Sequence, residues 1–457
     1  MHDGPSGLAN VQAGQPRGGA GRTNSSKPFR RTKYRSKASS IKPKSMKFLH
    51  TADWHLGNTF HGYDRAAEFR HFLDWLVNAL RAEQPDALLV AGDVYDTPNP
   101  SAAAEEMLYD FLLRATEAVP GLQVVLIAGN HDSAGRIDAP AALLKRHNIY
   151  VRGALPLLED GSAPDYEQLI LPLSSRTAPE AEAVCLAVPF LRPADYPAGM
   201  SPAEGLRYVF RNLQDTLRHS PFRGLPIVAV AHFYATGAEI SEGEHSERLV
   251  VGGQDCVPAE VVGAGVNYTA LGHLHKAQQV KCAGPQTAYA GSPLPLSFSE
   301  RTYERGVSIV EFDAEGLTGV RRLRYEPLRA LMALPARGAA RPEEILDLVA
   351  ALPQREAGDD GRDWPYLEIR VLEQRPEPSL LHRVAEALSD RAVHFCRMVR
   401  ELPDSGTKGD TAPAKTSSLQ ALSPLEMATR VFRDIYHNDL PEEMRTRFLQ
   451  AEQAAQA

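Results

Sequence analysis

The sequence predicts a layered α/β fold for the main body of the chain. Apolar runs of four or five residues alternate along it with stretches whose apolar residues recur at helical spacing. The runs are too short for helices and most are bounded by Gly, Asp or Asn, as buried strands are. Strands that alternate with helices are typical of sheets covered by helices. The 457 residues allow two or three domains with a large buried core.

Five apolar runs are the predicted strands, at residues 47–51, 87–91, 124–128, 227–231 and 268–271. Apolar residues spaced three and four apart predict a helix over 69–80 and another over 107–112. Asn99 and Pro100 are the predicted cap and first-turn proline of the second helix.

Potential metal ligands follow each predicted strand. They are Asp53 and His55, then Asp93 and Asp96, then Asn130, His131 and Asp132, then His232, and finally His273 and His275. Ligand sites in α/β sheets form at the carboxyl ends of strands, so segments far apart in sequence can meet in one pocket. Imidazole, carboxylate and amide groups without sulfur favour Mn²⁺ or Mg²⁺, with Fe²⁺ and Zn²⁺ as alternatives. So many ligands exceed the needs of one ion and predict a two-metal site.

Each motif also has an ordinary structural explanation when it is taken alone, since G-D and G-N pairs are frequent in turns. Their common placement at five strand ends favours the metal site. The remaining histidines lack that context, and we expect core or surface roles for His50, His61, His71, His147, His245, His382 and His437.

The motif order D-x-H, G-D-x-x-D, G-N-H-D, H, G-H-x-H resembles that of the calcineurin-like metallophosphoesterases over about residues 46–298. The stretches MKFLHTADWHLGNTF, LLVAGDVYDTPNPS and YAGSPLPLSFSE extend the resemblance to the double-strand-break repair nucleases of that superfamily. Its protein phosphatases would show G-D-x-x-D-R-G and G-N-H-E, whereas here Thr97 follows Asp96 and Asp132 follows His131. This departure counts against a phosphoprotein substrate.

The resemblance implies an α/β/β/α sandwich and a role for each site residue. One ion would be held by Asp53, His55 and His275, the other by Asn130, His232 and His273, and Asp93 would bridge both. His131 would be the catalytic side chain, because an imidazole next to an amide ligand can protonate a leaving oxygen or stabilise charge. Asp96 stands where some relatives carry histidine, so a catalytic role and a role in orienting its neighbours both stay open.

The activity implied by the resemblance is a Mn²⁺-dependent DNA exonuclease and hairpin or single-strand endonuclease, with Mg²⁺ as the alternative metal. Such nucleases serve DNA repair, recombination and replication as dimeric subunits of an ATP-driven complex with an SMC-like ATPase. Two other interpretations remain, a phosphoesterase of another substrate class on the same fold and a catalytically silent scaffold.

The first 45 residues differ in composition from the rest of the chain. They hold ten Lys or Arg and one acid, a formal charge of +9, whereas the remainder carries −16. Gly, Ser and Pro dominate this arm, so we expect it to be disordered. It is either an arm that touches nucleic acid or the product of a start assigned upstream of Met46, which directly precedes the first predicted strand.

The C-terminal part predicts separate units after a nuclease domain at residues 46–326. Residues 327–403 predict a small α+β module, with helices at 343–352 and 379–389 and a strand at 366–371. The resemblance implies a capping domain that helps select DNA shape. Residues 404–418 predict a linker, and two amphipathic patterns within 419–457 predict helices that dock on the ATPase or fold back onto the module.

Other features of the sequence agree with a cytoplasmic protein. No apolar run is long enough to span a membrane, residues 1–45 lack a signal-peptide core, and the four cysteines form no C-x-x-C pair. We also expect a twofold dimer through the helices at 69–80 and 107–112, which hold more apolar residues than one sheet-covering face needs.

Overall fold

The computed structural model describes residues 45–176, 178–238, 257–282, 284–372, 377 and 379–401, together with the single positions 429, 441 and 445. The predicted N-terminal arm up to residue 44 and the predicted linker lie outside the described residues. So do the predicted C-terminal helices, apart from those three positions.

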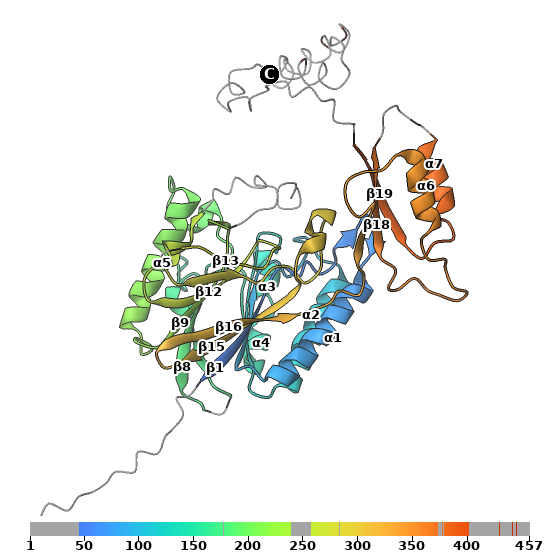
Figure 1. Ribbon diagram of the computed structural model, residues 1–457. Coiled ribbons are helices and arrows are strands. Elements are labelled where there is room, and N and C mark those ends of the chain that lie inside the picture. Colours follow the sequence, from blue (N-terminus) through green and yellow to red (C-terminus); the bar gives the residue numbers. More distant parts are fainter. Residues whose placement is uncertain are drawn as a thin grey trace, which may run out of the picture. The chain divides into compact units, whose positions relative to one another are not determined.

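Six strands form the first sheet, in the order β16-β15-β1-β4-β5-β6. Strands β16, β15 and β1 lie side by side in Figure 1. Their bounds are β1 Met46–Thr51, β4 Ala87–Ala91, β5 Gln123–Ile127, β6 Ile149–Arg152, β15 Gly306–Asp313 and β16 Gly316–Arg324. Strands β1, β4, β5 and β6 are parallel, while β15 and β16 run antiparallel at one edge. The carboxyl ends of the parallel strands therefore share one edge.

The second sheet also has six strands, in the order β13-β14-β12-β9-β8-β7. Their bounds are β7 Ile170–Ser174, β8 Ala181–Ala187, β9 Ile227–His232, β12 Val266–Gly272, β13 Gln278–Val280 and β14 Gln286–Tyr289. Strands β8, β9, β12 and β14 are parallel. The predicted strands at 227–231 and 268–271 thus lie side by side in one sheet.

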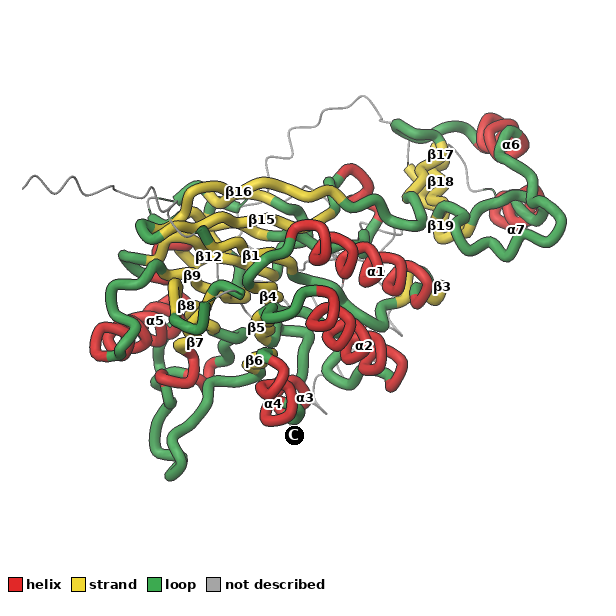
Figure 2. The backbone as a smooth tube through the Cα atoms, turned by 90° about the horizontal axis from the view of Figure 1, so that it is seen from below, coloured by secondary structure: helices red, strands yellow, loops and turns green. Residues whose placement is uncertain are grey.

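The two sheets pack face to face, and helices cover their outer faces (Figure 2). Helices α1 (Ala66–Glu83) and α2 (Ala102–Ala118) share a core with the first sheet. Helix α5 (Pro202–His219) shares a second core with the other sheet, while the short helices α3 (Ala134–Asp138) and α4 (Ala141–Leu144) lie near β6. The predicted α/β/β/α sandwich is confirmed.

Helix α2 begins at Ala102, two residues after Pro100, which was predicted to lie in its first turn. Its N-cap also differs from the predicted one. Ser101 is the N-cap, and its side chain accepts a hydrogen bond from the Ala104 amide at 3.3 Å. The Asn99 side chain instead accepts from Arg136 Nη2 at 2.5 Å. The cap assigned to Asn99 was wrong, because a serine two residues on has the extended backbone that a cap requires.

The apolar residues of α1 and α2 that were used to predict a dimer pack inside the chain itself. They are all buried in the core of the first sheet: Phe69, Phe72, Leu73, Leu76, Leu80, Met107, Leu108, Phe111 and Leu112. The argument from surplus apolar residues was therefore wrong. Among the described residues of these helices, the large apolar side chains left exposed are Tyr109 at 39% and Leu113 at 54%.

The C-terminal module, taken here as the described residues from 327 to 401, has a three-stranded sheet in the order β17-β18-β19. Its elements are β17 Leu331–Leu334, α6 Pro342–Ala350, β18 Tyr366–Leu372, α7 Leu380–Ala387 and β19 His394–Glu401. All three strands are parallel, and both helices share its apolar core. The two helices and the strand predicted here are confirmed. Across the part of the chain that the structure describes, no helix is long and apolar enough to cross a membrane.

Candidate metal centre

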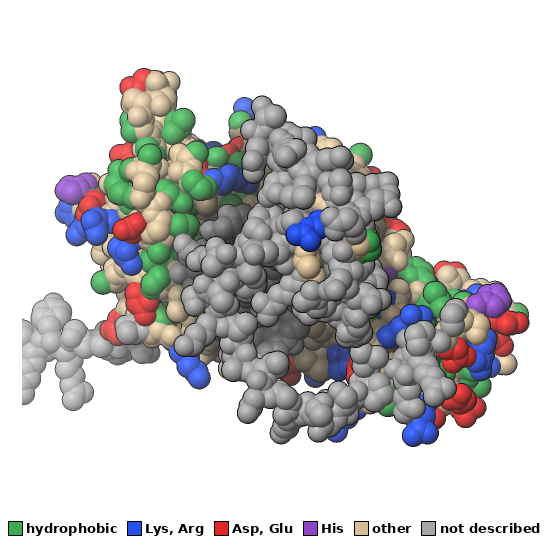
Figure 3. Space-filling view, turned by 90° about the horizontal axis from the view of Figure 1, so that it is seen from above, with side chains coloured by type: hydrophobic (Ala, Val, Ile, Leu, Met, Phe, Trp, Pro, Cys, Tyr) green, Lys and Arg blue, Asp and Glu red, His purple; other side chains and the backbone are tan. Residues whose placement is uncertain are grey.

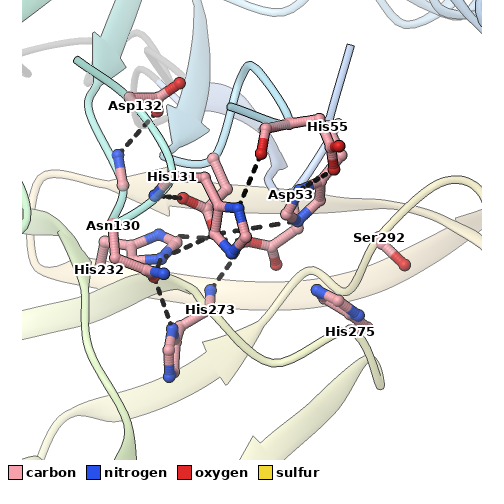
Figure 4. A network of polar contacts seen from close by, with 12 residues as sticks. Asp53, His55, Asn130, His131, Asp132, His232, His273, His275 and Ser292 are labelled. Atoms are coloured by element: carbon pink, nitrogen blue, oxygen red, sulfur yellow. Dashed lines mark hydrogen bonds and ion pairs between the residues drawn. The ribbon is translucent and has the colours of Figure 1, made fainter. Parts of the chain in front are cut away.

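The predicted site residues meet at the carboxyl ends of strands from both sheets (Figure 4). Asp53 and His55 follow β1, Asp93 follows β4, Asn130 and His131 follow β5, His232 ends β9, and His273 and His275 follow β12. The Asp53 amide donates to the Gly92 carbonyl at 3.0 Å within the first sheet. Its Oδ1 accepts from the His273 amide at 2.8 Å, which joins the two sheets at the site.

Four of the predicted metal ligands have left-handed backbone conformations. Their φ angles are 54° at Asp53, 50° at His55, 48° at Asp93 and 108° at His273. A non-glycine residue held in such a region costs about 1–3 kcal/mol, and such residues cluster at active sites. The chain therefore gives up stability to aim these side chains at one point.

The glycines of the motifs let the backbones approach closely. A Cβ atom on Gly129 would lie 2.1 Å from Asp93 Oδ1, and one on Gly272 would lie 1.9 Å from the Ala91 carbonyl oxygen. Neither contact is sterically possible. The G-N and G-H pairs of the sequence are thus explained by packing at the site as well as by turn formation.

One cluster of donor atoms surrounds Asn130. Its Oδ1 lies 3.0 Å from His232 Nε2 and 3.0 Å from His273 Nδ1. His232 Nδ1 donates to the Ala91 carbonyl at 2.8 Å, so Nε2 faces the site, 3.4 Å from Asp93 Oδ2. Ligand atoms of Asp93, His232 and His273 all lie within 4.8 Å of one another. This oxygen and nitrogen set fits a divalent cation.

A second group of donor atoms lies around His55. Both ring nitrogens of His55 and Asp53 Oδ2 are buried without a hydrogen bond among the described residues. His55 Nε2 lies 3.8 Å from Asp93 Oδ2, and the ring centroids of His55 and His275 are 5.2 Å apart. Buried polar atoms without partners cost free energy. A cation between these side chains would satisfy Asp53 Oδ2 and one ring nitrogen of His55. Asp93 Oδ2 faces this group as well as the one around Asn130.

Asp96 and His131 form a further close set with His55, with ligand atoms within 4.8 Å of one another. His131 Nδ1 donates to the Asp96 carbonyl at 2.8 Å, because a carbonyl oxygen can only accept. Asp96 Oδ1 accepts from Asn58 Nδ2 at 3.1 Å and lies 3.3 Å from His55 Nδ1. His131 Nδ1 and Asp96 Oδ1 thus already have hydrogen-bond partners within the chain, so the geometry favours orientation by Asp96 over metal ligation. His131 is exposed, which leaves its Nε2 for another partner.

The site has strong internal electrostatics. Burial lowers the pKa of His273 to about 3, and it raises the pKa of Asp53 to about 7. Burial would also lower the pKa of His232, yet the Asp93 carboxylate raises it to about 9. The buried carboxylates thus attract a positive charge, as a proton on His232 or as a metal cation.

Two buried carboxylates support the site as hydrogen-bond acceptors, and one of them, Asp132, had been counted among the potential metal ligands of the sequence. Asp132 accepts hydrogen bonds from the amides of Gly129 at 2.8 Å, Val94 at 3.1 Å and Tyr95 at 2.9 Å, and so ties two site loops together. Burial raises the pKa of Asp132 to about 6. Glu300 contacts His275 Nδ1 at 3.1 Å. The G-N-H-D motif offered a signal for Asp132, whereas no spacing rule points to Glu300.

The comparisons with known proteins agree with this geometry. Residues 46–277 match the family model of the calcineurin-like phosphoesterases, and residues 327–436 match that of the type 5 capsule protein repressor C-terminal domain. The SbcD subunit of the SbcCD nuclease of Rhodobacter capsulatus is 36% identical over 381 residues, covering 80% of this chain and 90% of that protein. The chain belongs to the SbcD nuclease family.

Other SbcD proteins are similarly related. The Bacillus subtilis protein is 32% identical over 75% of this chain and 83% of its own length, and the Escherichia coli K12 protein is 31% identical over 71% and 78%. The predicted family is confirmed, and with it a hydrolase of the nuclease and phosphodiesterase type that uses divalent metal ions.

Proposed function

We propose that this SbcD-family chain is the cytoplasmic nuclease subunit of an SbcCD-type complex and hydrolyses DNA phosphodiesters with two Mn²⁺ ions. Its activities would be exonuclease action on double strands and endonuclease action on single strands and hairpins, in repair and recombination. The observation that carries the proposal is the pair of donor groups on either side of Asp93, built from nitrogen and oxygen atoms without sulfur. Such donors suit Mn²⁺, with Mg²⁺ as the alternative.

The residue roles follow from the donor atoms. Asp53, His55 and His275 would hold one ion, Asn130, His232 and His273 the other, and Asp93 both. When bound, two such ions supply Lewis acidity and a water of lowered pKa. The protein's own part is to hold these side chains in strained conformations before substrate arrives, which removes reorganisation from the reaction.

His131 would act on the leaving oxygen of the DNA strand. Its Nδ1 proton is committed to the Asp96 carbonyl at 2.8 Å, so Nε2 is the atom that faces substrate. A protonated ring can donate from Nε2 to the departing 3′ or 5′ oxygen, and either protonation state of Nε2 keeps the hydrogen bond to Asp96. The nearby His55 ring, 4.9 Å away between centroids, limits the rotation of His131.

A partner protein would supply much of the binding affinity for DNA. Outside the first 45 residues the chain has a formal charge of −16, and the coloured side chains in Figure 3 include Asp and Glu as well as Lys and Arg. Nucleic-acid binders are usually basic over the binding face. We therefore propose that the SMC-like ATPase SbcC contributes phosphate contacts and binds the segment 419–457.

We further propose a homodimer within a heterotetramer with SbcC. Tyr109 and Leu113 are the exposed apolar side chains of α2 on which a second copy could pack. Light scattering at micromolar concentration should report a dimer, and replacing Tyr109 and Leu113 by Glu should give a monomer. A wild-type monomer would contradict the proposed dimer.

The proposed activity is tested on linear, plasmid and hairpin DNA against small phosphate monoesters and diesters, with Mn²⁺ or Mg²⁺ and with or without SbcC. We expect DNA cleavage that requires Mn²⁺ and stops on chelation by EDTA. Preference for a small ester would assign another substrate class to this fold. DNA binding without any hydrolysis would make the chain a scaffold.

A further inference from the structure

A buried ionic cluster lies between α1 and the C-terminal module. Glu68 of α1 accepts from Arg65 Nε at 3.0 Å and Nη2 at 3.1 Å, one bond to each carboxylate oxygen. The hydroxyl of Tyr366, in β18 of the module, donates to Glu68 Oε2 at 2.7 Å. Arg329 Nη1 donates to the same hydroxyl at 2.7 Å. Arg65, Glu68 and Tyr366 are fully buried.

Buried ion clusters are weak contributors to stability, because desolvation offsets most of their attraction. Apolar side chains of similar volume would hold the same elements together. The contacts that leave the cluster are therefore informative. One of them runs from Arg65 away from the module and toward the metal centre.

Asn58 connects the cluster to the candidate site. Arg65 Nη1 donates to Asn58 Oδ1 at 3.3 Å, and Asn58 Nδ2 donates to Asp96 Oδ1 at 3.1 Å. The amide can face only one way, since a guanidinium only donates and a carboxylate only accepts. Arg65 is itself held by a bond from Nη1 to the Pro295 carbonyl at 2.7 Å.

Asp96 is the last residue in this series of contacts, and two of its oxygen atoms lie next to histidines of the site. Its Oδ1 lies 3.3 Å from His55 Nδ1, and its carbonyl accepts from His131 Nδ1 at 2.8 Å. Its amide also donates to the Leu56 carbonyl at 3.2 Å, next to His55. A shift of Asp96 would therefore turn both imidazoles.

The module also contacts the segment between His55 and Arg65 directly. This segment forms the hairpin of β2 (Thr59–Phe60) and β3 (Tyr63–Asp64). The Tyr63 hydroxyl donates to the Phe395 carbonyl of β19 at 2.9 Å, and the rings of Phe60 and Tyr366 lie 4.8 Å apart. Module contacts thus fall on the same stretch of chain that carries the site.

We propose that Asn58 and Arg65 are positioning residues, which transmit the seating of the C-terminal module through Tyr366 and Glu68 to Asp96. The module then sets the orientation of His55 and His131 in addition to any contact it makes with DNA. This inference rests on the proposed roles of those two histidines. It assigns a role to four residues, Asn58, Arg65, Glu68 and Tyr366, that lie outside the D-x-H, G-D-x-x-D, G-N-H-D and G-H-x-H motifs.

Asn58→Asp is the first test variant, because it keeps the side-chain size but replaces the amide donor by a carboxylate that repels Asp96. Tyr366→Phe is the second, since it removes only the hydroxyl that binds Glu68. Tyr325→Phe is the matched control: Tyr325 is equally buried, and its hydroxyl bonds to His71 Nδ1 at 2.9 Å instead. Asn58→Ala serves if Asn58→Asp does not fold.

Two quantities are measured on the full chain. Calorimetric titration of the metal-free protein gives Mn²⁺ affinity, and hydrolysis of bis(p-nitrophenyl) phosphate at saturating Mn²⁺ gives kcat on a substrate too small to need the module. We expect Asn58→Asp to weaken Mn²⁺ binding about tenfold and Tyr366→Phe about threefold, each with a lower kcat. Tyr325→Phe should match the wild type. Since both variants cut one chain of contacts, the double variant should bind Mn²⁺ about as weakly as Asn58→Asp alone.

Unchanged Mn²⁺ affinity in Asn58→Asp, or in its alanine substitute, would overturn the proposal. Equal effects of Tyr366→Phe and Tyr325→Phe would do so as well, and so would additive losses in the double variant. Metal affinity is read without DNA. A wild-type protein that binds Mn²⁺ as expected but cleaves no DNA would therefore refute the proposed function and leave the positioning role intact.

Discussion

Glu300 Oε1 lies 3.1 Å from His275 Nδ1, and the other oxygen of Glu300 accepts from Arg305 Nη2 at 2.9 Å. Burial would raise the pKa of Glu300, but His275 and Arg305 lower it to about 2. The carboxylate is thus ionised at neutral pH. It accepts a hydrogen bond from the Nδ1–H group of His275, which leaves Nε2 as the ring nitrogen able to bind a cation.

Glu300→Gln should weaken metal binding without unfolding the protein. The amide can still accept from His275, but the lost charge makes the imidazole a poorer ligand, and such changes typically cost about tenfold or more in affinity. Mn²⁺ titration of the metal-free protein measures this. Glu83→Gln is the control, because Glu83 pairs with Lys47 and Arg321 outside the site. Equal affinities of the two variants would deny Glu300 this role.

The residues that meet at the candidate metal centre could be predicted from the sequence because each lies at or within a few residues of the end of a strand that is itself recognisable. Strand ends and ligands form one local pattern, and parallel strands bring such patterns together. Glu300 and Glu68 carry no local pattern of this kind. Glu300 acts on a residue 25 positions away, and Glu68 binds Tyr366 across 298 positions.

Two smaller predictions were wrong, the N-cap of α2 and the surplus of apolar residues in α1 and α2. Asn99 and Ser101 are both good caps, and the sequence does not say which one takes the extended conformation. The number of apolar residues in α1 and α2 suggested a surplus, but sheet and helices together bury all of those used in that argument. How much apolar surface a sheet accepts depends on its size and curvature, which composition does not reveal.

His131→Ala should keep both metal ions and lose most nuclease activity. The imidazole contacts the Asp96 carbonyl and has no ligand atom committed to the Asn130 cluster, so its loss removes proton transfer worth about 10²–10⁴-fold in rate. Elemental analysis of the purified protein and a DNA cleavage assay decide the matter. His147→Ala, an exposed histidine elsewhere, should behave like the wild type. Loss of metal together with activity would make His131 a ligand.

Asp93→Asn should be the most damaging ligand substitution. Asp93 Oδ2 lies 3.4 Å from His232 Nε2 and 3.8 Å from His55 Nε2, so it faces both donor groups. An amide removes the charge that would hold two cations close together, and we expect at most one tightly bound ion. Metal content after gel filtration measures this, with the structural carboxylate variant Asp86→Asn as the control. Two retained ions with near-normal activity would reject the bridge.

His50 should make the protein sensitive to acid. It is fully buried between the sheets, where Nε2 donates to the Leu271 carbonyl at 3.1 Å and Nδ1 accepts from the Tyr268 hydroxyl at 3.0 Å. Burial, with Arg322 nearby, lowers the pKa of His50 to about 3. In the unfolded chain, His50 binds a proton as the pH falls below its ordinary pKa of 6.5. In the folded state it stays neutral until the pH approaches 3. The stabilisation is therefore complete above pH 6.5 and declines as the pH falls toward 3.

His50→Gln should accordingly lose less stability than the wild type between pH 7.5 and pH 5. The two losses of unfolding free energy should differ by about 2 kcal/mol, because each pH unit below the ordinary pKa of histidine contributes about 1.4 kcal/mol. Urea unfolding in EDTA at the two pH values measures it. His219→Gln, at an exposed position in α5, should keep the wild-type slope. A wild-type slope in His50→Gln would mean that His50 protonates without cost.

The C-terminal segment should be the main anchor for SbcC. Its two amphipathic patterns follow a predicted linker of 15 residues, and apolar faces left in water cost about 25 cal/mol per Å². Deleting residues 419–457 should abolish co-purification with SbcC and any ATP stimulation, while Mn²⁺-dependent cleavage of short single strands persists. Replacing Phe432 and Ile435 by Asp should do nearly the same, because both lie on the predicted apolar face. Replacing Arg433 and His437 by Asp adds as many acidic groups off that face and should leave binding intact. Co-purification that survives the deletion would move the SbcC site to the nuclease domain or the module.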